Sequence, residues 1–279
     1  MFAVITCNKT HCSLMSKLKH FIRAPVAIPI QTKLYNSSYY VISIKHKCSA
    51  KQLAFACEEF PGKLLISSEI VLPQNSMYTK PDTSVFDRRI LINTAKSILK
   101  NSSVPLYMQS IGIIDVDGCC NETVRELVFT CPSVKVFTLN AINYSDFCFE
   151  MMEEHGAVIS IVNTPQALSD MSIIISPMPF VWEDKLSIKP PILSVQNVQL
   201  NGAVQLIHSF FPLLPTTFIS QIPLGVSPHE FAAAAYTHCN IPFLQDCIAE
   251  SGICKQNLPS VNQITNYINN EFYSQSRKK

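Results

Sequence analysis

Apolar residues from residue 87 to residue 176 follow two alternating patterns, a helical repeat and short continuous runs. Ile90, Leu91, Thr94, Ile98 and Leu99 recur every three or four residues, which predicts a helix over residues 87–100. The strand-like segment at residues 108–114, which ends in Ile111-Gly-Ile-Ile114, predicts a strand. The same patterns predict helices at 121–131 and 143–155, strands at 134–139, 157–162 and 171–176, and one helical turn at 164–168. Such alternation is typical of a parallel sheet wrapped by helices.

The flanking segments show weaker patterns. Before residue 87, the pattern predicts strands at 26–34, 39–45 and 63–72, and a helix at 49–60. Ser227-Pro-His-Glu230 is a strong helix start, with a capping serine, proline at the first position and glutamate at the third. Further predictions are a strand at 192–200 and helices at 203–211, 231–239, 243–251 and 261–273.

These elements predict an α/β protein with a Rossmann-like parallel sheet carrying helices on both faces, preceded by a smaller α/β lobe. We expect an irregular basic N-terminus at 1–24, the small lobe at 25–104, and the Rossmann-like domain with C-terminal helices at 105–279. The boundary is placed at the polar segment Asn101–Pro105.

The composition of the chain indicates its cellular location and which kinds of partner to expect. Apolar residues are 47% of the chain, yet no run reaches the roughly 18–20 apolar residues that span a bilayer. We therefore expect a cytoplasmic protein without a membrane partner, whose eleven cysteines are reduced and mostly buried. Residues 1–57 carry a charge of +8 and the remainder −6. Because the basic residues are scattered and not grouped with aromatic residues, nucleic acid is an unlikely partner.

Glycine is scarce, and its spacing excludes two kinds of nucleotide site. The chain has seven glycines, of which Gly112 and Gly118 are the closest pair. Neither G-x-G nor G-x-x-x-x-G-K occurs. Loops that surround phosphates with backbone N–H groups need glycine for positive φ and close approach, so the sequence argues against a standard dinucleotide site or a P-loop.

Acidic and polar residues follow the predicted strands at the end where open parallel sheets bind ligands. Asp115 and Asp117 come directly after the first strand of the domain, and two residues apart they would project to the same face. Two carboxylates at such a short distance repel each other unless a cation lies between them. The candidate ligand-binding residues are Asp115, Asp117, Gly118, Thr138, Asn140 and Asn163.

The string Ile113–Gly118 resembles the first motif of haloacid-dehalogenase-type phosphatases. That resemblance implies Asp115 as nucleophile, Asp117 as acid and base, magnesium as cofactor, and Thr138 in the place of the second motif. Cys119 stands where that family carries threonine, and the helix follows at once. The alternative is that Asp117-Gly118 forms a turn at the end of the strand while Asp115 caps the helix or is solvated.

The order of elements from residue 108 to residue 176 is similar to the cofactor domain of shikimate-dehydrogenase-like proteins, which also have a smaller α/β lobe in front. This resemblance implies an NAD(P)-dependent oxidoreductase. However, Asp115–Cys119 stands where the glycine fingerprint should be. Two carboxylates there would repel a pyrophosphate by about 1–4 kcal/mol each at about 4 Å.

No metal site is predicted, and the cofactor remains unassigned. C-x-x-C does not occur, and the adjacent Cys119 and Cys120 are expected to point in different directions. His238, Cys239, Cys247 and Cys254 have spacings typical of buried helical faces. The favoured interpretation is a non-catalytic ligand-sensing or interaction protein on a degenerate nucleotide-binding-type fold. Its expected partner is a small-molecule ligand or a protein, which includes a second copy of the chain in a homo-oligomer. The enzyme alternatives are the magnesium-dependent phosphatase and the oxidoreductase.

Overall fold

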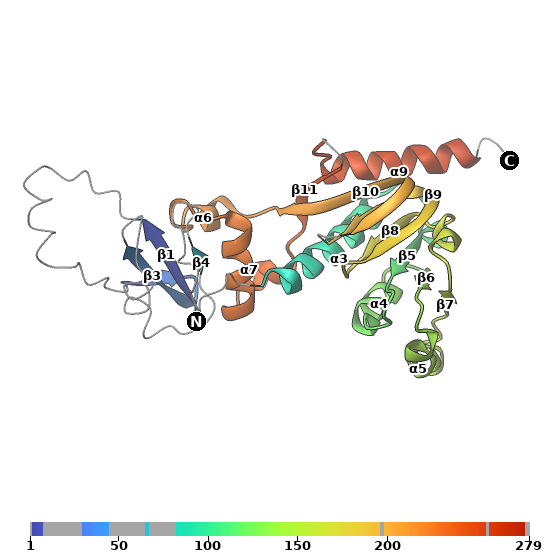
Figure 1. Ribbon diagram of the computed structural model, residues 1–279, viewed down its shortest axis with the longest axis horizontal. Coiled ribbons are helices and arrows are strands. Elements are labelled where there is room, and N and C mark those ends of the chain that lie inside the picture. Colours follow the sequence, from blue (N-terminus) through green and yellow to red (C-terminus); the bar gives the residue numbers. More distant parts are fainter. Residues whose placement is uncertain are drawn as a thin grey trace, which may run out of the picture. The chain divides into compact units, whose positions relative to one another are not determined.

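The computed structural model describes residues 2–7, 30–44, 65–66, 82–195, 198–254 and 257–276 (Figure 1). The predicted helix at 49–60 and most of the predicted strand at 63–72 lie outside these ranges. Within the part that the structure describes, no helix is long and apolar enough to cross a membrane.

The chain divides into two compact units. The first comprises residues 1–86 and 214–245, and the second comprises residues 87–213 and 246–279. The expected ranges differ from these, since they placed the boundary after residue 104 and gave residues 214–245 to the larger domain. The structure instead divides the chain inside helix α3 (Ser84–Asn101) and returns it to the first unit after residue 213.

The first unit contains a four-stranded sheet of order β2-β3-β1-β4. Its strands are β1 (Ala3–Cys7), β2 (Ile30–Leu34), β3 (Ser37–Ile44) and β4 (Leu65–Ile66), and its helices are α6 (Thr216–Ile219), α7 (Pro228–His238) and α8 (Pro242–Gln245). β1 corrects the prediction of an irregular N-terminus, because Val4 and Ile5 are fully buried between neighbouring strands. The predicted cap of α7 is confirmed, since Ser227 Oγ accepts a hydrogen bond from the Glu230 N–H.

The second unit contains a seven-stranded sheet of order β11-β10-β9-β8-β5-β6-β7. Its strands are β5 (Ser110–Ile114), β6 (Ser133–Phe137), β7 (Ile159–Val162), β8 (Ile173–Ser176), β9 (Val181–Ser194), β10 (Gln199–Pro212) and β11 (Ala249–Ile253). All pair in parallel except β11, which is antiparallel to β10. From β7 to β10 the order is 3-2-1-4-5-6, that of the doubly wound dinucleotide-binding fold. The predicted Rossmann-like fold class is confirmed.

Helices accompany this sheet, largely where the pattern predicts them. They are α3, α4 (Asn121–Val128), α5 (Ser145–His155) and α9 (Val261–Ser276), with single turns η1 (Leu106–Met108), η2 (Ala141–Tyr144) and η3 (Pro165–Leu168). α5 ends at Gly156, whose φ of 63° lets its N–H bond back to the last turn.

Two predicted helices are wrong. Residues 203–211 belong to β10, where Ser209 has a φ of 51° and the pairing with β11 shifts register between His208 and Phe211. This irregularity breaks the two-residue alternation of a strand, so the buried Ile207 and Phe210 are spaced as in a helix. Residues 243–251 divide between α8 and the edge strand β11.

The first part of β9 crosses one face of the sheet before the strand joins it. Trp182 packs edge-on against Phe137 at the carboxyl end of β6. Lys189 and its neighbours line a cavity together with Ser110 and Ser172, at the amino ends of β5 and β8. Residues 181–188 therefore run opposite to the sheet strands, and only the end of β9 pairs with β8.

The start of β10 pairs with this crossing segment, and together they form a two-stranded arm (residues 181–188 and 199–203). Gln166 of η3 fixes the arm, because its side-chain amide donates to Ser187 O at 2.8 Å and its oxygen accepts from Ser187 N at 3.2 Å. Leu186 and Ile188 of the arm pack in one apolar cluster with Ile114 and Ile174 of the sheet. Two strands thus pack on one face of the sheet in addition to the helices.

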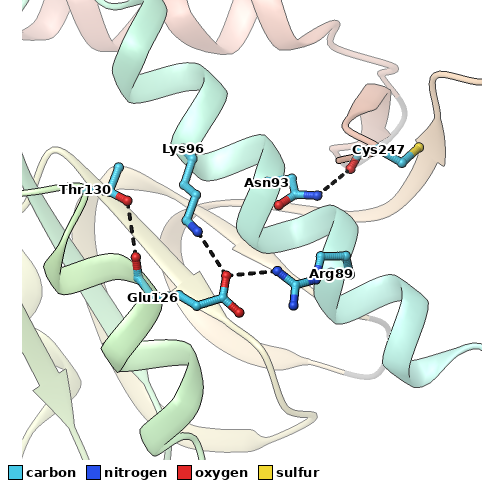
Figure 2. Close-up of polar contacts among 6 residues, drawn as sticks. All are labelled: Arg89, Asn93, Lys96, Glu126, Thr130 and Cys247. Atoms are coloured by element: carbon cyan, nitrogen blue, oxygen red, sulfur yellow. Dashed lines mark hydrogen bonds and ion pairs between the residues drawn. The ribbon is translucent and has the colours of Figure 1, made fainter. Parts of the chain in front are cut away.

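Helix α3 is joined to α4 by ionic contacts, which Figure 2 shows. Arg89 Nη1 and Lys96 Nζ of α3 each lie 2.9 Å from Glu126 Oε2 of α4. Asn93 donates to Cys247 O at 3.0 Å, which connects α3 to the segment before β11. Burial raises the pKa of Glu126, but Lys96 and Arg89 outweigh burial and hold that pKa below its ordinary value of 4.5.

We expect Glu126→Gln to lower the free energy of unfolding by about 1–2 kcal/mol at pH 7, because charge-assisted hydrogen bonds become neutral ones. A carboxyl group with a depressed pKa in the folded state stabilises the protein above its unfolded pKa and loses that contribution as pH falls through the folded pKa. The difference between wild type and variant should therefore shrink below about pH 4.5. Urea unfolding of both proteins at several pH values measures this difference.

Glu122→Gln is the control, since the side chain of Glu122 is 87% exposed and its distance to Arg125 is long, at 3.7 Å. Equal losses in the two variants would contradict the prediction.

Candidate functional site

The candidate site lies at the point where the strand order reverses. β5 lies between β6 and β8, so the chain leaves β5 toward one side of the sheet and later resumes on the other. Open α/β sheets bind ligands outside the carboxyl ends of the strands at such a point. The β5–α4 loop (Asp115–Cys120) occupies this position, and Thr138–Asn140 follow the neighbouring β6.

The carboxyl group of Asp115 points into the protein and is fully buried. Asp115 Oδ2 accepts hydrogen bonds from the backbone N–H of Cys120 at 2.8 Å and from the hydroxyl of Tyr144 at 2.6 Å. The Cys119 thiol lies 3.7 Å from Asp115 Oδ1. Since Cys120 is the N-cap residue of α4, this carboxyl group sits where the helix dipole and free N–H groups favour an anion.

The side chains around the buried Asp115 carboxyl group have raised pKa values. Burial raises the pKa of Cys120, and the negative charge of Asp115 raises it further. The pKa of Cys119 is raised by the same two causes in the same order. Burial, followed by the hydrogen bond to Asp115, raises the pKa of Tyr144, which therefore remains a donor at neutral pH.

Asp117 is exposed, which corrects the expectation that it shares a face with Asp115. The strand ends at Ile114, and the chain turns through Gly118, whose φ is 69° and whose N–H donates to Asp115 O at 3.2 Å. Alternation of side chains between two faces holds only within the strand. The two carboxyl groups therefore form no pair, and the Asp115 carboxyl group is not exposed to solvent, where a phosphate ester would bind.

The polar residues after β6 hold the β5–α4 loop in place. The Thr138 hydroxyl donates to Val116 O at 3.2 Å, and the Asn140 amide donates to Asp117 O at 3.2 Å. Asn143 of η2 also donates to Asp117 O at 3.2 Å. The polar groups of these three side chains are therefore used in hydrogen bonds to the loop backbone.

Gly118 lies within the β5–α4 loop, whereas Asn163 is not part of it. A Cβ on Gly118 would lie 3.1 Å from both Asn140 O and Asn143 Cβ, so glycine lets the loop pack closely. Asn163 follows β7 and is exposed. The structure thus brings five of the six candidate residues into one loop assembly, in which Asp115 points inward and Asp117 outward.

Sequence reasoning missed Tyr144 and the closeness of the two cysteine sulfur atoms. Asp115, Cys119 and Cys120 each place a potential ligand atom within 4.8 Å of the other two. Cys119 is exposed and Cys120 is buried, yet their sulfur atoms stay within that distance where the chain turns into α4. No signal in the sequence connects Tyr144 to a carboxyl group 29 residues earlier.

A cavity of about 210 Å³ lies elsewhere on the same unit, at the amino ends of β5 and β8. Ser110, Ser172, Lys189 and Tyr267 are among its lining residues. Because ligands of open α/β sheets bind at the carboxyl ends of the strands, the β5–α4 loop remains the stronger candidate.

Comparison with known proteins finds only weak likenesses to solved structures. No family model matches the chain, and no curated protein matches it. The Δ(1)-pyrroline-2-carboxylate reductase of Thermococcus litoralis, solved with NADH and L-proline, is 18% identical with a TM-score of 0.30 over 40% of this chain and 37% of that one. L-tryptophan dehydrogenase of Nostoc punctiforme is 10% identical with a TM-score of 0.31 over 87% and 71% of the two chains. The first match spans little more than a third of the reductase, and neither match assigns an activity to this chain.

Proposed function

We propose that this protein is a non-catalytic ligand-sensing or interaction protein built on a nucleotide-binding-type fold that has lost its dinucleotide site. The observation that carries the proposal is the carboxyl group of Asp115 at the N-terminus of α4. In dinucleotide-binding proteins of this topology, the pyrophosphate occupies that position.

The loop differs from a dinucleotide site at each glycine position. When G-x-G-x-x-G is laid on the β5–α4 loop, its glycines fall on Asp115, Asp117 and Cys120. The first of these side chains already satisfies the N–H group of Cys120, and its charge repels a second anion. At about 4 Å each carboxylate would cost a pyrophosphate about 1–4 kcal/mol, depending on the local dielectric. Both effects favour a fold without a bound dinucleotide.

The enzyme alternatives receive less support from this geometry. The phosphatase interpretation requires the Asp115 carboxyl group to contact the substrate as the nucleophile. In the structure this side chain is buried and accepts a hydrogen bond from Tyr144. The oxidoreductase interpretation needs a pyrophosphate at the position that Asp115 occupies. Neither Thr138 nor Asn140 changes this, since both side chains bind the loop backbone.

We expect no thermal stabilisation of the full chain by NAD⁺, NADH, NADP⁺ or NADPH, and no hydrolysis of a generic phosphate ester with magnesium. A ligand present at a hundredfold excess over its Kd would stabilise the native state by about 2.7 kcal/mol, which a thermal shift readily detects. Stabilisation by any of the four nucleotides, or hydrolysis that Asp117→Ala abolishes, would overturn the proposal.

The cytoplasmic location and the homo-oligomer remain predictions. The sheet of the second unit ends at β7, whose outer edge pairs with no other strand among the residues described. Edge strands present unpaired N–H and C=O groups, which suit an interaction partner. Light scattering on the purified chain tests self-association, with a mass well above the 31.2 kDa of one chain as the expected result and a monomer as the contrary one.

A further inference from the structure

We propose that the β5–α4 loop binds one Zn²⁺ ion through Asp115 Oδ1, Cys119 Sγ and Cys120 Sγ. This inference rests on the proposed function, because it names the class of ligand that the altered dinucleotide site would sense. Among the residues that the structure describes, these three form the one group of side chains with donor atoms close enough for shared metal binding.

The donor atoms are spaced as a tetrahedral zinc site requires. Zinc binds thiolate sulfur at about 2.3 Å and carboxylate oxygen at about 2.0–2.2 Å, so tetrahedral angles place sulfur and oxygen about 3.6 Å apart and two sulfurs about 3.8 Å apart. Cys119 Sγ lies 3.7 Å from Asp115 Oδ1, and each pair of donors lies within 4.8 Å. Small side-chain rotations bring the set to bonding distance.

The donor types select the metal. Two sulfurs with one oxygen suit a borderline-soft cation such as Zn²⁺, whereas Mg²⁺ and Ca²⁺ require oxygen ligands. Binding converts two thiols to thiolates and releases two protons to solvent, so two thiolates and one carboxylate surround the dication with a net charge of −1. The N-terminus of α4 favours that negative charge, since Cys120 is its N-cap.

The surroundings of Asp115 complete the site. Asp115 Oδ2 remains bonded to the Cys120 N–H and the Tyr144 hydroxyl, which leaves Oδ1 directed at the cysteines. Partners of this kind orient metal-binding carboxylates and raise affinity. Cys119 is exposed, so the ion can enter from solvent and the fourth coordination position stays open to water or to a partner's side chain.

Cobalt titration of the reduced, metal-free full chain tests the site, because thiolate-bound Co²⁺ absorbs in the near ultraviolet and Zn²⁺ displaces it. The chain has eleven cysteines, so the result is the difference between variants. Cys119→Ser should lose one bound equivalent relative to wild type. Cys148→Ser is the matched control, since Cys148 on α5 is a half-buried thiol outside the cluster, and it should bind as wild type does. Tyr144→Phe keeps all three ligands and should weaken binding about 10–100-fold.

Equal cobalt binding by wild type and Cys119→Ser would overturn the zinc site, as would loss of the signal in Cys148→Ser alone. Thermal unfolding without metal shows that each variant is folded. Failure of zinc binding together with absence of nucleotide binding would refute the zinc site and leave the proposed function standing. Binding of NAD(P) would refute the proposed function itself.

Discussion

Asp115→Ala should lower the free energy of unfolding by about 2–4 kcal/mol. The substitution removes the acceptor of the Cys120 N–H and of the Tyr144 hydroxyl, and both donors are buried around it. A buried donor left without a partner costs about 1–3 kcal/mol, and α4 also loses the anion at its N-terminus. Urea unfolding followed by circular dichroism measures the loss.

The matched control is Asp117→Ala, which removes the exposed carboxyl group of the same loop. Exposed surface substitutions usually change stability by less than about 0.5 kcal/mol. Equal losses of unfolding free energy in the two variants would show that the Asp115 carboxyl group does not stabilise the N-terminus of α4. Tyr144→Phe separates the contributions, since it removes one of the two donors and should cost about 1–2 kcal/mol.

Gly202→Ala should destabilise the second unit by about 3 kcal/mol or more. Gly202 lies in the two-stranded arm with a φ of 118°, and a Cβ there would collide with the backbone of Leu186 on the paired strand. Positive φ costs a non-glycine residue about 1–2 kcal/mol, and a clash in a packed region adds about 1–3 kcal/mol. The loss is measured as a shift of the urea unfolding midpoint.

Gly156→Ala separates the two causes. Gly156 also has positive φ, 63°, but a Cβ there would meet no atom within 4 Å. Its replacement should cost only about 1 kcal/mol. If Gly202→Ala were as mild, the pairing of β9 and β10 across the face of the sheet would be wrong.

The parallel sheet could be predicted because its strands are short apolar runs separated by helical repeats. β5 and β8 are buried along their whole length, so their sequences are rich in consecutive Ile, whereas β6 alternates apolar and polar residues. The full length of β9 and β10 could not be predicted, since Pro190-Pro191 and the irregularity at Ser209 disturb the alternation that marks a strand. The pattern predicts only a short strand at 192–200 and a helix at 203–211 where the chain forms the long strands β9 and β10.

At the candidate site, the sequence located the loop but not the direction of its side chains. The acidic residues and the missing glycines singled out Asp115–Cys119 as the segment that stands where a dinucleotide fingerprint would be expected. That Asp115 points inward depends on Tyr144, a tertiary contact that periodicity does not contain. The closeness of Cys119 and Cys120 depends equally on the turn into α4.

A crystal structure of the protein soaked with NADH tests the central claim most directly. The account predicts that the Asp115 carboxyl group remains bonded to the Cys120 N–H and the Tyr144 hydroxyl, with no pyrophosphate at the N-terminus of α4. A pyrophosphate bound at that helix end, with the Asp115 side chain turned outward, would contradict it.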